Sequence, residues 1–134
     1  MKPAWILTIA AASAILATGA ASAHHSFAAE FDRSLPVNVT GTVTKVEWMN
    51  PHARFYVDAK DDAGKVVNWD FELASPNGLM RRGWNRNSMK IGDTVTVTGF
   101  RAKNNPAVGN ASTVTLADGK KLFAGSSSEN AATQ

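Results

Sequence analysis

The chain has 134 residues, no cysteine and a formal net charge of +3. The lack of cysteine excludes disulfides and thiolate chemistry, and so small a charge excess does not by itself indicate nucleic-acid binding. This length suits one domain that is stabilised by apolar burial.

Residues 1–23 have the pattern of a secretory signal. Lys2 provides the positive start, an apolar run rich in small residues follows, and Ala21-Ser22-Ala23 matches the small-x-small cleavage pattern. A membrane anchor is the alternative, but the run is weakly apolar and the cleavage pattern follows it at once. We therefore expect a mature chain that begins at His24, is periplasmic or secreted, and has no membrane span.

Residues 24–36 are predicted to form an N-terminal arm. Its apolar residues are Phe27 and Phe31, and their spacing of four would place both rings on one side of a short helix. An extended tail held by the two rings explains the same spacing, and both alternatives stay open.

Residues 37–48 predict one long, bent strand. Its apolar residues form two sets of opposite parity: Val37, Val39 and Val43, then Val46 and Trp48. A change of parity near Lys45 indicates a bulge at which the strand changes its buried face, and Gly41 permits a sharp bend. A strand of this kind serves two sides of a small closed barrel.

Residues 54–60 and 65–73 alternate as two strands of a hairpin, with the turn at Asp61-Asp62-Ala63-Gly64. The inward set is Phe55, Val57, Ala59, Val67, Trp69, Phe71 and Leu73. The outward set is Arg54, Tyr56, Asp58, Asn68, Asp70 and Glu72. The acidic turn lacks the spaced ligands of a calcium loop.

Ser75 and Pro76 have the residue types that begin a helix. We expect Leu79, Met80 and Trp84 to cover the core, and Gly83 to stop the helix. Further strands are predicted at 94–100 and 112–116, with a polar loop at 101–110, a short edge at 121–123 and a disordered tail at 125–134. This order predicts a mostly β fold, an OB-fold-like five-stranded barrel over residues 37–124 with one short helix between strands three and four.

Several motifs occur together in the chain: His24-His25-Ser26-Phe27, Val46-Glu47-Trp48, Asn50-Pro51-His52, Trp69-Asp70-Phe71-Glu72 and Gly92-Asp93-Thr94-Val95. With these motifs the chain resembles a family of small exported bacterial proteins described only as a domain of unknown function. The resemblance covers nearly all of the mature chain, and it implies export and a small β-barrel. It implies no activity and no catalytic residues.

The three histidines predict a metal site. If His24 is the first residue of the mature chain, its α-amine and ring nitrogen can bind one ion, and His25 or His52 can supply a further nitrogen. Nitrogen ligands in a square-planar array suit Cu(II). The alternative is that His25 is plain surface and that His52 donates a hydrogen bond which holds the turn at Asn50 and Pro51.

A second candidate is the outward face of the two hairpin strands, since OB-folds bind oligosaccharides and oligonucleotides there. Its residues are Arg54, Tyr56, Asn68, Asp70 and Glu72. With one aromatic side chain among carboxylates, this face is a poor platform for a polyanion. The basic residues are Arg81, Arg82, Arg86, Lys90, Arg101 and Lys103, and we interpret them as solvated surface rather than as a nucleic-acid site.

No nucleophile motif or glycine-rich phosphate loop occurs in the sequence, so we do not expect an enzyme. Glu47, Asp70 and Glu72 could form a carboxylate pair, but Asp70 and Glu72 merely share the outward parity of one strand. Trp48, Trp69 and Trp84 follow the pattern of the core. The sequence favours a non-enzymatic exported module that binds a small ligand or a metal ion, with copper as the leading ion. An oligosaccharide or protein interaction module of the cell envelope is the alternative, and a purely structural role also stays open.

Overall fold

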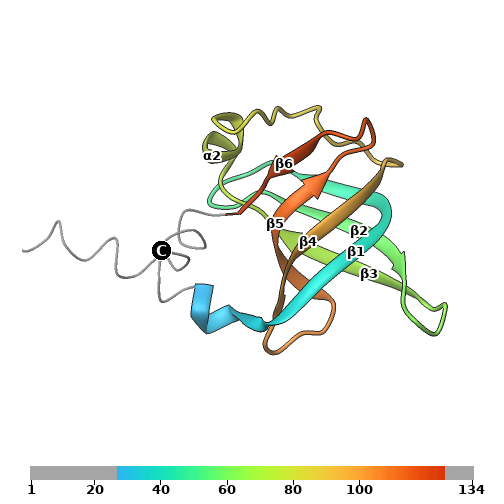
Figure 1. Ribbon diagram of the computed structural model, residues 1–134. Coiled ribbons are helices and arrows are strands. Elements are labelled where there is room, and N and C mark those ends of the chain that lie inside the picture. The colour runs from blue at the N-terminus through green and yellow to red at the C-terminus, as the bar shows by residue number, and fades with distance from the viewer. Residues whose placement is uncertain (1–26, 126–134) are drawn as a thin grey trace, which may run out of the picture.

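The computed structural model describes residues 27–125, and within them a mostly β fold is formed by six strands and two short helical segments (Figure 1). A helical turn at residues 27–30 precedes the first strand. The further elements are β1 (Phe31–Glu47), β2 (Arg54–Lys60), β3 (Val66–Glu72), α2 (Pro76–Met80), β4 (Thr94–Ala102), β5 (Val108–Thr115) and β6 (Lys121–Phe123).

The strands pair in the order β3-β2-β1-β4-β5-β6, and β3 also pairs with β5. The β3–β5 pairing is parallel, whereas the other neighbours are antiparallel. The pairings from β1 to β5 therefore form a ring, and the end of β3 lies directly beside β5. In Figure 1, α2 and the segment after it lie across the upper end of this ring.

The long, bent strand predicted from the sequence is β1. Its register against β2 shifts between Val43 and Lys45, which confirms the predicted bulge. At Gly41 an added Cβ would lie 2.2 Å from the carbonyl oxygen of Asp58, so the glycine lets the two backbones approach closely. The strand begins at Phe31, inside the segment predicted as an arm, because its pairing with β4 continues to that residue.

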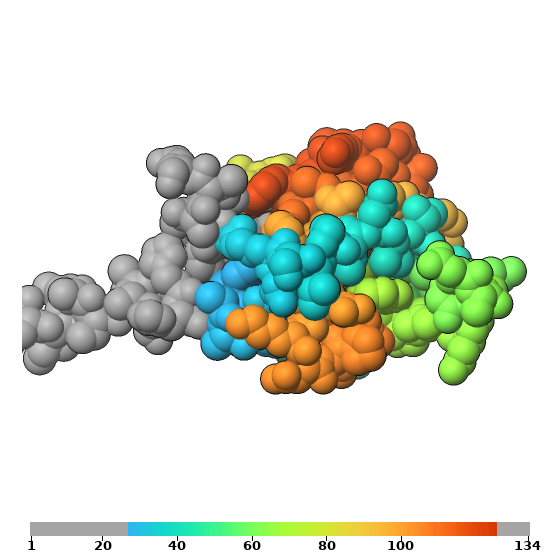
Figure 2. Space-filling view, turned by 60° about the horizontal axis from the view of Figure 1, so that its bottom comes forward, coloured from blue at the N-terminus to red at the C-terminus, as the bar shows by residue number. Residues whose placement is uncertain are grey.

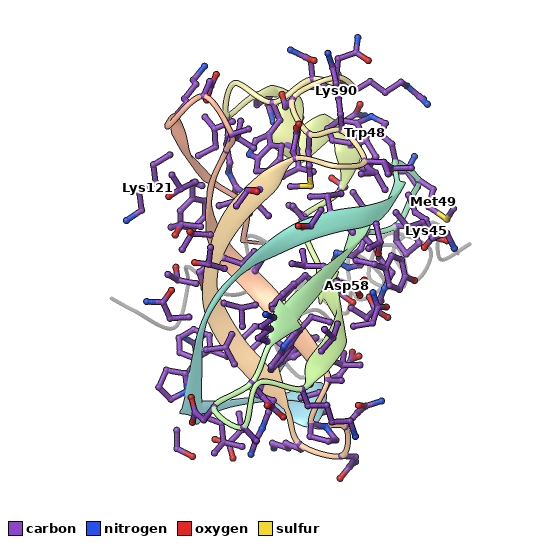
Figure 3. All side chains as sticks on the ribbon, turned by 90° about the vertical axis from the view of Figure 1, so that its right-hand side faces the viewer. Lys45, Trp48, Met49, Asp58, Lys90 and Lys121 are labelled. Atoms are coloured by element: carbon purple, nitrogen blue, oxygen red, sulfur yellow. The ribbon has the colours of Figure 1, made fainter. Side chains whose placement is uncertain are left out.

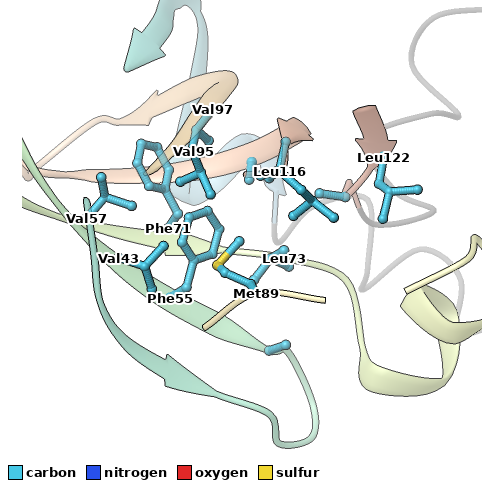
Figure 4. Close-up of a cluster of buried hydrophobic side chains, with 14 of the residues drawn as sticks. Val43, Phe55, Val57, Phe71, Leu73, Met89, Val95, Val97, Leu116 and Leu122 are labelled. Carbon is cyan, nitrogen blue, oxygen red and sulfur yellow. The ribbon is translucent and has the colours of Figure 1, made fainter. Parts of the chain in front are cut away.

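The core fills the inside of the ring (Figure 4). The rings of Phe55 and Phe71 stack with their centroids 5.5 Å apart, and both side chains are fully buried. Val95 and Val97 on β4 are also buried, which confirms the predicted inward sets of β2 and β4. This burial of large apolar side chains is the main source of stability in a chain without cysteine.

The start of the helix follows the prediction. Ser75 caps it by accepting a hydrogen bond from the backbone N–H of Gly78, and Pro76 occupies the first turn. Leu79 and Trp84 are buried, and the indole of Trp84 donates to the carbonyl of Phe123 on β6 at 2.9 Å. The prediction for Met80 is wrong, since half of its surface is exposed on the outer side of this one-turn helix.

Other boundaries and one burial differ from the predictions. Both β4 and β5 extend into the predicted loop 101–110, because the residues there pair with each other and with β3. Trp69 faces inward as expected but is only partly buried, because it lies where the ring opens rather than in the middle of the core. The predicted tail lies outside the described residues, apart from Gly125.

A smaller apolar cluster joins the segment before β1 to the sheet. Phe27 and Phe31 are buried, with their rings 5.4 Å apart, and they pack with Ala102, Phe100 and Val108. Of the two alternatives for the arm, a short helix and an extended segment, each holds for one part: Phe27 lies in the helical turn, and Phe31 begins β1. The two rings thus fix the described start of the chain against β4 and β5.

Candidate functional site

The outward residues of β2 and β3 form one polar surface, which we call the outer polar face. It consists of Arg54, Tyr56, Asp58, Asn68, Asp70 and Glu72, with Lys45 and Glu47 of β1 beside them. The strand pairing places Arg54 opposite Glu72 and Tyr56 opposite Asp70. Figure 3 shows this side of the molecule, with Lys45 and Asp58 labelled.

Cross-strand bonds order the outer polar face. The guanidinium of Arg54 donates to the carboxylates of Asp70 at 2.9 Å and Glu72 at 3.2 Å. Tyr56 donates its hydroxyl to Glu47 at 3.2 Å, and the ammonium of Lys45 lies 5.1 Å from the centre of the Tyr56 ring. The predicted ligand-face residues therefore come together, but much of their bonding capacity is used among themselves.

The amide of Asn68 completes this arrangement. Its Nδ2 donates to Asp58 at 2.7 Å and to the hydroxyl of Thr44 at 3.2 Å. Four carboxylates and two fixed cations face outward here, so the surface is acidic when all of them are ionised. An acidic, hydrogen-bonded surface of this kind does not attract polyanions.

Two carboxyl groups of this face differ in their proton affinity. The hydrogen bond from Lys45 lowers the pKa of Glu47, whose side chain is partly buried. Burial raises the pKa of Glu72, and the electrostatic interactions with His52 and Arg54 oppose this effect only in part. The nearby carboxylate of Glu30, in the helical turn before β1, raises the pKa of Glu72 further. The pKa values of Glu47 and Glu72 are therefore shifted in opposite directions.

His52 lies at the Glu72 end of this face. Its Nδ1 lies 2.9 Å from the carbonyl oxygen of Leu73 and 3.7 Å from a carboxylate oxygen of Glu72. A carbonyl only accepts hydrogen bonds, so Nδ1 carries the proton and, in the neutral ring, Nε2 carries the lone pair. No group within residues 27–125 bonds to Nε2. The predicted hydrogen bond of His52 exists, but it fastens the loop to the end of β3.

The other two predicted metal ligands, His24 and His25, lie outside the described residues. The described chain begins at Phe27, whose ring contacts that of Phe100 edge-on at 6.3 Å. Phe100 pairs with Asn110, which pairs with Glu72. Two strand spacings of about 4.8 Å each thus separate Phe100 from Glu72. Among residues 27–125, no group of three or more His, Cys, Asp or Glu side chains is placed to hold a metal ion.

The side chain of Asn110 is a buried polar group without hydrogen-bond partners. It is 1% exposed, and neither its amide nitrogen nor its amide oxygen has a hydrogen-bond partner. Buried polar groups are normally bonded, and an unbonded one destabilises the fold. Sequence reasoning placed this residue in a loop and gave no sign of its burial.

A groove that the sequence did not predict lies at the open end of the ring. Trp69 is shared by two adjoining hollows of about 510 Å³ and about 350 Å³, and so are Asn38, Val39 and Arg101. One face of the Trp69 indole stacks on Phe71, with the ring centres 5.4 Å apart and the planes within 7°. We call these two hollows the open groove.

The predicted basic residues do not form one surface. Arg82 donates to the carbonyl of Gly125 and lies over the ring of Phe123, at the end of the molecule near α2. Lys103 donates to the carbonyl of Ala28, beside the helical turn before β1. Arg101 lines the open groove. Arg82, Lys103 and Arg101 thus lie in three separate places.

Comparisons with known proteins give a family but no activity. Residues 12–111 match a family described as a family of unknown function (DUF6152). No curated protein matches the chain. Within residues 27–125, none of the helices has the length and apolar character needed to cross a membrane.

Proposed function

Because the chain belongs to DUF6152, a family whose function is unknown, we propose a function from its geometry: it is a non-enzymatic, exported binding module that holds Cu(II). The proposed ligands are the α-amine and ring of His24, with His25 and His52 as further nitrogen donors. The proposal requires cleavage after Ala23, which would release the protein into the periplasm or the medium.

The order of elements supports an OB-type barrel. Three strands, a helix and two strands follow each other, and β5 returns to pair in parallel with β3. Proteins of this fold bind ligands at the loops between strands, and His52 lies in the loop between β1 and β2. The fold alone does not identify the ligand.

The environment of His52 is the observation that carries the proposal. Metal-binding histidines usually donate one ring N–H to a carbonyl or carboxylate, which fixes the ring and leaves the other nitrogen for the ion. His52 donates from Nδ1 to Leu73, and Glu72 lies 3.7 Å away. Its Nε2 is therefore oriented and has the lone pair that a metal requires.

The number of residues between His24 and Phe27, where the described chain begins, also supports the proposal. His24 precedes Phe27 by three residues, which span about 10 Å when extended. Two strand spacings, about 10 Å in total, separate Phe100 under Phe27 from Glu72 beside His52. An extended segment of this length is thus long enough to reach His52, which supports the proposal.

The test is a Cu(II) titration of two matched proteins. One starts at His24, and the other carries a single alanine before it, which turns the α-amine into an amide. We expect the extended protein to lose most of its affinity, and binding to weaken as the pH falls because protons compete for the nitrogen ligands. Equal binding by both proteins would refute the N-terminal site.

The same titration tests the contribution of His52. His52→Ala should weaken Cu(II) binding about tenfold or more, in the range found when one partner of a metal site is changed. Asn50→Ala is the control, since it changes the same loop without removing an imidazole. If His52→Ala and Asn50→Ala bind Cu(II) alike, the site consists of the N-terminal residues alone.

An interaction module for an oligosaccharide or a protein is the second candidate. The outer polar face supports it, because its donors and acceptors are fixed in place around one aromatic ring, Tyr56. Tyr56→Ala should then weaken ligand binding while the protein stays folded. A screen of glycans and envelope extracts that finds no ligand dependent on Tyr56 would exclude this candidate.

A further inference from the structure

Within residues 27–125, the first half of β1 is paired on one side only. From Phe31 to Thr42 it pairs with β4, whereas its pairing with β2 begins at Thr42 and continues to Glu47. Beyond Asp58, β2 leaves β1, and the open groove lies between the two strands. Every second residue of an antiparallel strand points its N–H and C=O away from its partner, so β1 presents a row of backbone groups to this groove.

Apolar side chains line the same groove in a period of two. Leu35, Val37 and Val39 are half-buried, while the residues between them are exposed. Val67 and Trp69 of β3 lie across from them. These side chains face the inside of the ring at the end where too few residues fill it, and an unfilled apolar surface beside a strand edge is typical of a binding site.

Two cations, Lys60 and Arg101, line the groove, and the carboxylates of Asp61 and Asp62 lie on its rim. Within the part of the chain that the structure describes, no carboxylate lies within ion-pair distance of Arg101. The carboxylate of Asp61, on the opposite rim, accepts from the backbone N–H groups of Ala63 and Lys65 and so stabilises its own turn. Among the described residues the acidic neighbour of Arg101 is Asp32, which interacts with it electrostatically without an ion pair, so the guanidinium can still pair with an acidic group that enters from outside.

We propose that the open groove binds an extended peptide segment of another protein, which adds to the free edge of β1 as a further strand. Its alternate apolar side chains would lie over Val39 and Trp69, and an acidic side chain would pair with Arg101. A sugar ring would use the indole but not the row of backbone groups, whereas an added strand uses both. Figure 2 shows this side, with β1 in cyan, the loop after β4 in orange below it, and the β2–β3 hairpin in green at the right.

The site is distinct from the proposed copper site. His52 lies in the loop after β1, whereas the groove lies along the first half of β1, between residues 34 and 40. Failure of one proposal therefore leaves the other standing.

The first experiment uses two displayed heptapeptide libraries of the same composition. In one, valine, leucine and phenylalanine alternate with polar residues; in the other, the order is scrambled. We expect the protein to enrich the alternating library and, within it, peptides with an acidic residue. Equal enrichment of both libraries, or none, would overturn the proposal.

The second experiment tests the backbone bonds and the charge. N-methylation of every second amide in the best peptide should weaken binding at least about tenfold, since two or more hydrogen bonds are lost. Arg101→Glu should shift the preference from acidic to basic peptides by about fivefold. Lys121→Glu is the matched control, because it makes the same charge change on the exposed side of β6 and should leave the preference unchanged.

Three results would contradict the proposal. Unchanged binding after N-methylation would mean that side chains alone hold the peptide. An unchanged preference in Arg101→Glu would remove the role assigned to that cation. A dimer that dissociates when the peptide is added, seen by sedimentation, would mean that a second copy of this chain is the natural occupant.

Discussion

The outer polar face and the open groove share the strands β1, β2 and β3, yet they differ in whether their side chains and backbone groups have bonding partners. On the outer polar face, Arg54 bonds to both carboxylates opposite it, and Tyr56 and Asn68 also bond across strands. In the open groove, half-buried apolar side chains and an unpaired strand edge have no such partners among the described residues. The polar residues that the sequence suggests as a binding face are thus largely bonded to one another. The apolar residues that the sequence suggests as core are instead the ones that a ligand can contact.

Replacement of Phe71 tests the contrast between core and groove most strongly. Phe71 is fully buried, so Phe71→Ala should lower the free energy of unfolding by about 3–5 kcal/mol, as measured by urea denaturation. Trp69→Ala is the matched change in the groove, and it should cost clearly less because Trp69 is only partly buried. Equal losses would show that Trp69 belongs to the core and that the groove is closed in solution.

Gly41 marks the point where β1 passes from one region to the other. Gly41→Ala should destabilise the protein by about 1–3 kcal/mol, because the new methyl group would lie 2.2 Å from the Asp58 carbonyl oxygen. Thr42→Ala, at the neighbouring exposed position, should cost less than this. A neutral Gly41→Ala would mean that β2 can move away from β1 without loss.

The side-chain amide of Asn110 has no hydrogen-bond partner, whereas that of Asn68 has two, and replacing each by leucine tests the difference. Asn110→Leu should raise the free energy of unfolding by about 1 kcal/mol, since it removes a buried amide without hydrogen-bond partners. Asn68→Leu should lower it slightly, because the bonds to Asp58 and Thr44 are lost. A destabilised Asn110→Leu would indicate that the amide is bonded in solution.

Glu72 gives the smallest effect, a change in the pH dependence of stability. Its native pKa lies above the ordinary value of 4.5, so the native state binds more protons than the unfolded state between the two values. The contribution of Glu72 to the free energy of unfolding therefore falls as the pH rises from about 4.5 through the native pKa. Stability in Glu72→Gln, measured by thermal unfolding, should decline less over this range than in the parent protein. Parallel pH curves would contradict the raised pKa.

The sequence predicts well those features that depend on alternation or on local turn chemistry. The inward sets of β2 and β4, the bulge before Lys45 and the cap at Ser75 are all confirmed. Each of these follows from residues that are close together in the chain. Alternation also places Arg54, Tyr56 and Asp70 on one face, where the structure joins them.

The features that the sequence misses depend on contacts between distant strands. Half-buried Trp69 has the same parity as buried Phe71, and only the place where β2 leaves β1 separates the two. In the same way, Asn110 is polar and follows a glycine and a proline, which is typical of a loop, whereas its pairing with Phe100 and Glu72 places it in β5. Parity tells which way a residue faces, but not what fills the space in front of it.

The one-sided pairing of β1 also sets the order in which the chain can fold. Its second half can form a hairpin with β2 as soon as both are synthesised, since Val46 pairs with Phe55. Its first half must wait for β4, because partners such as Thr40 and Thr96 are 56 positions apart in the chain. Pairings of such long range make a β-rich protein fold in milliseconds to seconds rather than microseconds. We therefore expect the β1–β2–β3 meander to gain hydrogen-exchange protection first and the β1–β4 seam to close last.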